Sequence, residues 1–123
     1  MTDAGALVTA FIREFDTEHP NPETLADYFT LDAIYHNIPM RAVQGRDAVR
    51  QVLTGYTSRY QCKGWEVLHQ AVDGNVVLNE RIDRFGHGDK VIELRVMGVF
   101  EVRDGKIAAW RDYFDAAEWQ SQQ

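Results

Sequence analysis

The chain has 123 residues and a mass of 14.1 kDa, which suits one domain, residues 1–123, with a sizeable core. Hydrophobic residues make up 45% of the sequence and include three Trp, five Tyr and six Phe, so disordered and low-complexity classes are excluded. The formal net charge of −6 disfavours nucleic acid and anionic membranes as partners. The single cysteine, Cys62, excludes an internal disulfide and a cysteine-based zinc site.

The first residues carry no basic stretch ahead of an apolar run, such as a secretory signal would have. No segment approaches the roughly 18 consecutive apolar residues that a membrane-spanning helix needs. We therefore expect a cytoplasmic protein that makes no use of a membrane.

The amino-terminal part of the chain is typical of helices. Apolar residues recur at helical spacing over residues 7–15, and Thr2 or Asp3 is placed to cap this helix. Asn21 followed by Pro22 then predicts the start of a second, short helix, because asparagine is a good cap and proline is well tolerated at the first helical position.

The pattern changes from helix to strand further along the chain. The second helix should end with Phe29 on its apolar side, a short strand is expected over residues 33–38, and a third helix should follow Gly45. Four longer strands separated by turn sequences come next, over residues 65–72, 76–85, 91–102 and 107–114. Helices followed by an antiparallel meander predict an α+β domain, whose sheet can curl around the helices and enclose a pocket.

Polar residues occur in the strands at positions where the pattern calls for apolar ones. Side chains alternate between the two faces of a strand, so Arg81 and Asp83 point the same way in the middle of one strand. In the last strand, Asp112 shares a face with Trp110 and Phe114. A carboxylate buried there needs a compensating charge. Each feature alone is also typical of a solvated strand surface.

Tyr35 and Asn37 share a face of the short early strand and can position a water molecule by hydrogen bonding. If this face meets those of the later strands, one pocket holds a phenol, an amide, a guanidinium and two carboxylates. An arginine between two neighbouring aspartates favours one ionised and one protonated acid. That pairing suits concerted catalysis, with a base on a water molecule and an acid on a leaving oxygen.

Other kinds of site find little support in the sequence. The histidines have no partner at metal-ligand spacing, so no metal site is expected; they are His19, His36, His69 and His87. Sequence motifs of serine hydrolases, dinucleotide-binding proteins and P-loop proteins do not occur. We interpret Cys62 as a packing residue rather than a nucleophile.

The same polar residues carry a resemblance to a known family. The segments Tyr35-His36-Asn37, Glu80-Arg81-Ile82-Asp83 and Trp110-Arg111-Asp112-Tyr113-Phe114-Asp115 resemble the active-site segments of the limonene epoxide hydrolase family. Residues 45–49 and 98–100 are similar to it as well, and the likeness runs in order from about Tyr35 to Trp119. The resemblance implies a cone-shaped fold of the nuclear-transport-factor-like type, with N-terminal helices packed into the concave face of a strongly curved, mixed, mainly antiparallel sheet. It also implies a homodimer formed through the outer face of the sheet.

The resemblance further implies a role for each polar residue. Asp112 would be the base that takes a proton from water, while Tyr35 and Asn37 hold that water with it. Asp83 would protonate the epoxide oxygen, and Arg81 would bridge the two carboxylates. Water would then attack a ring carbon directly and give a vicinal diol, without a covalent intermediate and without a cofactor.

Apolar residues near these segments suit a small nonpolar epoxide, although such a stripe is also typical of an ordinary core. The expected substrate-lining residues are Tyr56, Tyr60, Cys62, Trp65, Phe85, Leu94, Val96 and Phe114. The bulk of Tyr56, Tyr60 and Trp65 argues against limonene oxide itself as the substrate. Two other functions stay open: an isomerase or cyclase of the same fold, similar to ketosteroid isomerases or polyketide cyclases, and a binding module without catalysis.

Overall fold

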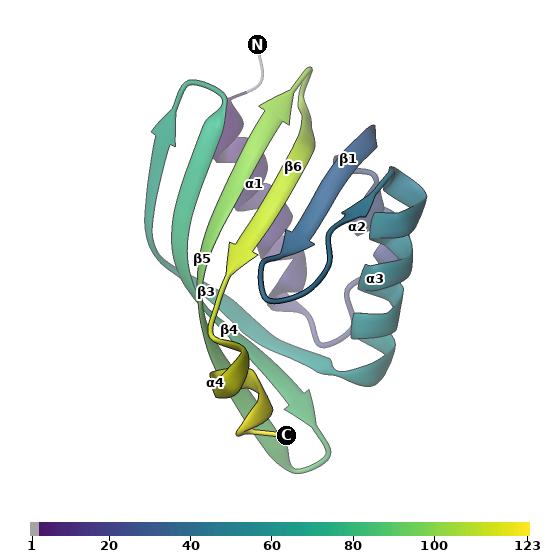
Figure 1. The fold of residues 1–123 in the computed structure, drawn as a ribbon, viewed down its shortest axis with the longest axis vertical. Coiled ribbons are helices and arrows are strands. Elements are labelled where there is room, and N and C mark those ends of the chain that lie inside the picture. The colour runs from purple at the N-terminus through teal and green to yellow at the C-terminus, as the bar shows by residue number, and fades with distance from the viewer. Residues whose placement is uncertain (1–2) are drawn as a thin grey trace.

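The computed structural model describes residues 3–123, which form an α+β domain built on one six-stranded sheet (Figure 1). The elements, in chain order, are α1 (Ala4–Arg13), the 3₁₀ turn η1 (Glu14–Asp16), α2 (Pro22–Ala26), β1 (Phe29–Asn37), β2 (Val43–Gln44), α3 (Arg46–Arg59), β3 (Gln61–Asp73), β4 (Val76–His87), β5 (Lys90–Arg103), β6 (Lys106–Tyr113) and α4 (Ala116–Gln120).

The helices begin where capping residues allow them to. The side chain of Asp3 accepts a hydrogen bond from the backbone N–H of Ala6 and caps α1, whereas Thr2, the other candidate cap, lies outside the described residues. Asn21 caps α2 in the same way by accepting from the backbone N–H of Glu23. The predicted caps therefore fix the start of both helices.

The strands run in the order β2-β1-β6-β5-β4-β3. The pair β1–β6 is parallel and every other pair is antiparallel, so the sheet is mixed and mainly antiparallel, as expected. The sheet is curved but not closed, because β2 and β3 remain as its two edges. Figure 1 shows α1 crossing behind the sheet and α3 standing beside β1.

The start of β1 differs from the sequence-based expectation, and two short elements were not expected. β1 begins at Phe29, whereas the sequence pattern placed this residue on the apolar side of the second helix. Strand pairing places Phe29 in β1 rather than in the helix, because Phe29 lies opposite Ile107 of β6 and the backbone N–H of Ile107 donates to the carbonyl of Tyr28. The short elements β2 and α4 carry too few residues to show a period, and the sequence analysis missed both.

The core fills the concave side of the sheet with aromatic rings. Phe11 of α1 packs edge-on against Phe29 and Trp110, with ring centroids 5.3 and 5.0 Å away, and Phe15 stacks on Trp65 at 3.8 Å. These rings fill part of the concave face, and one of them, Trp65, also lines a cavity there. Among the described residues no helix combines the length and the apolar character needed to cross a membrane.

Candidate active site

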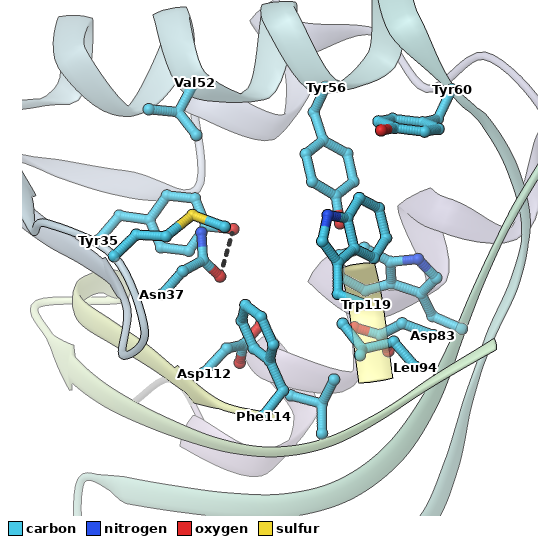
Figure 2. Close-up of a pocket in the computed structure, with 13 residues that line it drawn as sticks. Tyr35, Asn37, Val52, Tyr56, Tyr60, Asp83, Leu94, Asp112, Phe114 and Trp119 are labelled. Atoms are coloured by element: carbon cyan, nitrogen blue, oxygen red, sulfur yellow. Dashed lines mark hydrogen bonds between the residues drawn. The ribbon is translucent and has the colours of Figure 1, made fainter. Parts of the chain in front are cut away.

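A cavity of about 200 Å³ opens between the concave face of the sheet and the helices α3 and α4. Figure 2 shows Val52 and Tyr56 reaching into it from α3, while Asp112 and Phe114 lie on the opposite side. Its lining is apolar except for a few polar side chains. The lining residues are Tyr35, Asn37, Met40, Val52, Tyr56, Tyr60, Trp65, Asp83, Leu94, Val96, Asp112, Phe114 and Trp119.

Strand register brings the polar residues together on the concave face of the sheet, beside and in the cavity. Going from β3 to β1, directly opposed residues form one row: Gln70, Asn79, Gly98, Asp112 and Asn37. Arg81 and Asp83 follow Asn79 at intervals of two on β4, so their side chains point to the same face as this row. Positions that are 75 residues apart in the chain thus become neighbours.

Arg81 joins the two aspartates through direct hydrogen bonds. Its Nε donates to Oδ1 of Asp83 at 3.0 Å, and its Nη2 donates to Oδ2 of Asp83 at 3.0 Å and to Oδ2 of Asp112 at 2.8 Å. The side chains are almost completely buried, with exposed fractions of 0% for Arg81, 3% for Asp83 and 5% for Asp112. One guanidinium therefore bridges two carboxylates in a site with little access to water.

The second oxygen of Asp112 is also held. The indole Nε1 of Trp110 donates to Oδ1 of Asp112 at 2.7 Å, and the indole itself is stacked on the ring of Tyr35 with centroids 4.2 Å apart. Both oxygens of Asp112 thus accept a hydrogen bond from a fixed donor. The carboxylate keeps one orientation towards the cavity.

Tyr35 and Asn37 stand on β1 beside Asp112. The hydroxyl of Tyr35 lies 3.5 Å from Oδ1 of Asn37, and both residues line the cavity. Burial raises the pKa of the Tyr35 phenol far above its ordinary value, and the negative charge of Asp112 adds to this effect. The phenol therefore keeps its proton at neutral pH and can donate a hydrogen bond to a molecule in the cavity.

The surroundings of Asp83 and Arg81 set the protonation of these two residues. Burial raises the pKa of the Asp83 carboxyl above its ordinary value, and Arg81 offsets this only in part, so that the pKa lies at about 6. Arg81 remains charged, because Asp112 and Asp83 raise its pKa although burial opposes its charge. Asp83 can therefore carry a proton near neutral pH while it stays hydrogen-bonded to a cation.

Gly98 provides the space for the guanidinium. A Cβ at this position would lie 2.3 Å from Nη1 of Arg81 and 2.9 Å from Oδ1 of Asp112, well inside contact distance. The guanidinium carbon of Arg81 also lies over the rings of Trp65 and Phe100, at 5.3 and 5.9 Å from their centroids. The site accepts Arg81 in this position only because position 98 carries no side chain.

Gly98→Ala is expected to displace the Arg81 guanidinium and to slow any reaction that depends on its bridge between Asp83 and Asp112 roughly ten- to hundredfold, because small misplacements of reacting groups are costly. Gly55→Ala is the matched control: Gly55 lies on α3 with no other atoms within 4 Å of an added Cβ, so this change should leave the rate unaltered. Turnover and thermal unfolding of both variants check the expectation. Wild-type activity in Gly98→Ala would contradict it.

The structure places the expected lining residues in two groups. Tyr56, Tyr60, Trp65, Leu94, Val96 and Phe114 line the cavity, whereas Cys62 and Phe85 lie in the core beside it. The Phe85 ring packs 5.0 Å from Tyr56 and 5.5 Å from Trp119, which line the cavity themselves. Burial raises the pKa of the Cys62 thiol to about 12, which fits a packing residue.

The sequence analysis missed Met40, Val52 and Trp119 as lining residues. Trp119 lies on α4, whose cap Asp115 accepts a hydrogen bond from the backbone N–H of Ala117. An aspartate followed three residues later by Glu118 is a helix-start pattern, and this signal could have revealed the helix. α4 is fastened to β5 by hydrogen bonds from Arg95 to Glu118.

Histidines take no part in the arrangement. His19, His69 and His87 are exposed, and the ring of His36 contacts the carbonyl of Met40. Within residues 3–123, no group of three or more His, Cys, Asp or Glu side chains is placed to hold a metal ion.

Comparison with known proteins identifies the family. The family described as limonene-1,2-epoxide hydrolase catalytic domain matches residues 3–123, almost the whole chain. The chain belongs to this family. It is 37% identical over 97 residues to the epoxide hydrolase EphG of Mycobacterium tuberculosis, a match that covers 72% of this chain and 63% of that protein. The matched region is thus less than two thirds of this relative.

Solved structures show the same family and fold. A structure of an LEH-like epoxide hydrolase of M. tuberculosis is 30% identical, has a TM-score of 0.80 and covers 97% of this chain and 87% of its own. A protein of ketosteroid isomerase-like fold from Catenulispora acidiphila is 16% identical, has a TM-score of 0.82 and covers 94% of this chain and 90% of its own. The second likeness concerns the fold alone and agrees with the nuclear-transport-factor-like architecture expected from the sequence.

Proposed function

We propose that this member of the epoxide hydrolase family adds water to a nonpolar epoxide and yields a vicinal diol in one step. The observation that carries the proposal is the bridge from Arg81 to both Asp83 and Asp112, at the edge of an apolar cavity that Tyr35 and Asn37 also line. A strained ring needs only an activated water and a polarised oxygen to open, and the site offers groups for both.

In the proposed reaction, Asp112 takes a proton from a water molecule held by Tyr35 and Asn37. The water oxygen attacks one ring carbon, the bond from that carbon to the epoxide oxygen breaks, and Asp83 gives its proton to the departing oxygen. Both oxygens of the diol are then accounted for: one comes from water and one from the epoxide. Arg81 keeps its charge throughout and links the two carboxyl groups. Asp112 gains one proton and Asp83 loses one, so the total number of protons on the two carboxyl groups stays the same.

The substrate is proposed to be a compact apolar epoxide that fits against aromatic rings. Four aromatic residues, Tyr56, Tyr60, Trp65 and Trp119, line the cavity together with the two aspartates. Incubation of the purified protein with cyclohexene oxide and limonene oxide, followed by chiral analysis of the diols, tests the function. Proton exchange beside a ketone with no diol formed would favour an isomerase instead and would overturn the proposal.

The proposed role of Asp83 predicts a falling limb in the pH profile. The acid must be protonated to act, and its pKa of about 6 means that the protonated fraction in the free protein falls as the pH rises through that value. The rate constant kcat/KM should therefore drop about tenfold for each pH unit well above 6. Initial rates between pH 5 and pH 9 measure this limb. A profile that is level up to pH 9 would rule out Asp83 as the acid.

The outer face of the sheet is proposed as the surface of a homodimer. Apolar side chains on this face remain 40–46% exposed in the single chain; they are Leu68, Leu78, Met97 and Tyr113. Exposed apolar groups clustered on one face are typical of a contact between subunits. Sedimentation equilibrium tests the proposal, since a mass of about 28 kDa, twice that of the chain, is expected. A mass of 14.1 kDa would contradict it.

A further inference from the structure

A chain of side-chain amides connects the candidate site with the first helix. Asn79 is completely buried, and its Oδ1 accepts a hydrogen bond from Nη1 of Arg81 at 2.8 Å. Its Nδ2 donates to Oε1 of Gln70 on the neighbouring strand at 3.2 Å. The Nε2 of Gln70 in turn donates to the carbonyl of Gly5 at 3.4 Å and to the hydroxyl of Thr9 at 3.1 Å.

Which group donates and which accepts in each of these hydrogen bonds is determined by the groups at the two ends of the series, the Gly5 carbonyl and the Arg81 guanidinium. The carbonyl of Gly5 can only accept, so Gln70 must turn its NH₂ group towards α1 and its oxygen towards Asn79. Asn79 must then turn its NH₂ group towards Gln70 and its oxygen towards the site. The guanidinium of Arg81 can only donate, and it meets an oxygen there. No other orientation of the two amides satisfies both ends.

The hydrogen-bonded amides connect parts of the fold that are already held close by packing and by strand pairing. At Gly5, a Cβ would lie 3.0 Å from a methyl group of Val72, so the start of α1 is packed tightly against β3. Gln70 and Asn79 are directly opposed in the sheet, and Asn79 is opposed to Gly98, the position that leaves room for the guanidinium. The carbonyl at one end of the chain is therefore fixed by the backbone, and the two amides link this fixed point to the cation at the other end.

We propose that Asn79 and Gln70 are positioning residues, which hold the Arg81 guanidinium in the orientation that lets it bridge Asp83 and Asp112. The inference rests on the proposed hydrolysis, because it assigns these residues to the same reaction. Asp83 accepts hydrogen bonds from Nε and Nη2 of Arg81, and Asp112 accepts one from Nη2. The two carboxylates therefore leave Nη1 without a hydrogen bond from either of them. Asn79 accepts a hydrogen bond from Nη1. Gln70 keeps the amide of Asn79 from turning its NH₂ group towards the cation, because it accepts a hydrogen bond from that group.

Gln70→Leu is the variant that tests the proposal, because Gln70 is only half-buried and does not line the cavity. We expect kcat for an epoxide to fall roughly ten- to hundredfold with KM unchanged, since the fault lies in the alignment of the reacting groups. Gln61→Leu is the matched control: it changes the same residue type on the same strand, and among the described residues the Gln61 side chain has no hydrogen-bond partner. It should behave as the wild type.

A second measurement does not depend on activity. In the wild type, the four Nη–H protons of Arg81 should give separate signals in ¹H–¹⁵N NMR spectra, because the hydrogen bonds block rotation of the guanidinium. In Gln70→Leu these signals should broaden or merge. In an Asn79→Asp background, where either oxygen can accept from Arg81, adding Gln70→Leu should change the Arg81 signals no further.

The two measurements separate the failure of this proposal from failure of the proposed function. If the wild type hydrolyses no epoxide, the Arg81 signals still decide whether the amides position the cation. Wild-type Arg81 signals in Gln70→Leu would overturn the proposal, whatever the value of kcat. A fall in kcat that Gln61→Leu shows equally would overturn it as well.

Discussion

Asp112→Asn is expected to lower kcat for epoxide hydrolysis by about a hundred- to ten-thousandfold, the range that a well-placed general base contributes. The asparagine keeps an oxygen that can accept from Trp110 or Arg81, so the side chain stays in place while the base is lost. In the structure, both oxygens of Asp112 are held by these donors and the residue lines the cavity. Diol formation from cyclohexene oxide, measured at saturating substrate, gives the value.

Asp115→Asn is the matched control for this variant. Asp115 is an exposed carboxylate three residues further along, and it caps α4 with a side-chain oxygen that asparagine also offers. Its rate and its thermal stability should equal those of the wild type. If Asp112→Asn retained more than a tenth of the wild-type kcat, Asp112 would not be the base.

Arg81→Met is expected to have the largest effect on stability. It leaves Asp83 and Asp112 buried side by side without their cation, and breaking a buried ion pair in this way costs about 3–5 kcal/mol of unfolding free energy. The loss should be greatest at neutral pH and smaller near pH 4, because the pKa of Asp83 is raised by burial and this carboxyl takes up a proton there. Urea unfolding at both pH values measures it.

Two further variants show whether the stability loss comes from uncompensated charge. Arg81→Met combined with Asp83→Asn and Asp112→Asn should regain much of the stability at pH 7 while staying inactive, because no buried charge remains. Arg103→Met removes an arginine whose partner, Asp32, is exposed, so it should cost less than about 1 kcal/mol. A triple variant no more stable than Arg81→Met would contradict this explanation.

The alternation of side chains along the strands was enough to predict that Arg81 and Asp83 share a face, and that Tyr35 shares one with Asn37. Turn sequences located the strands well enough for this pattern to hold, because a hairpin fixes the phase of both its strands. Which residues oppose one another across the sheet could not be predicted in the same way. The row from Gln70 to Asn37 depends on the registers of several strand pairs, including the parallel pair β1–β6.

The roles of Gly98 and Trp119 show the same limit. Gly98 matters because it stands opposite both Asn79 and Asp112, a relation between three strands that no local pattern records. Trp119 reaches the cavity from a helix of five residues, too short for a helical period to appear. Cys62 and Phe85 share the face of the site, yet larger rings near them take the lining positions. Side-chain size and register, rather than local sequence, decide these details.

The most direct test of the one-step mechanism is a single turnover in water enriched in ¹⁸O, with the protein in excess over a small epoxide. Direct attack by water predicts that the diol from this first turnover carries one ¹⁸O atom and that the protein carries none. An aspartyl ester intermediate would instead place an unlabelled carboxylate oxygen in the diol and leave ¹⁸O in Asp112 or Asp83, which peptide mass spectrometry would detect. Unlabelled diol with labelled protein would contradict the proposed mechanism.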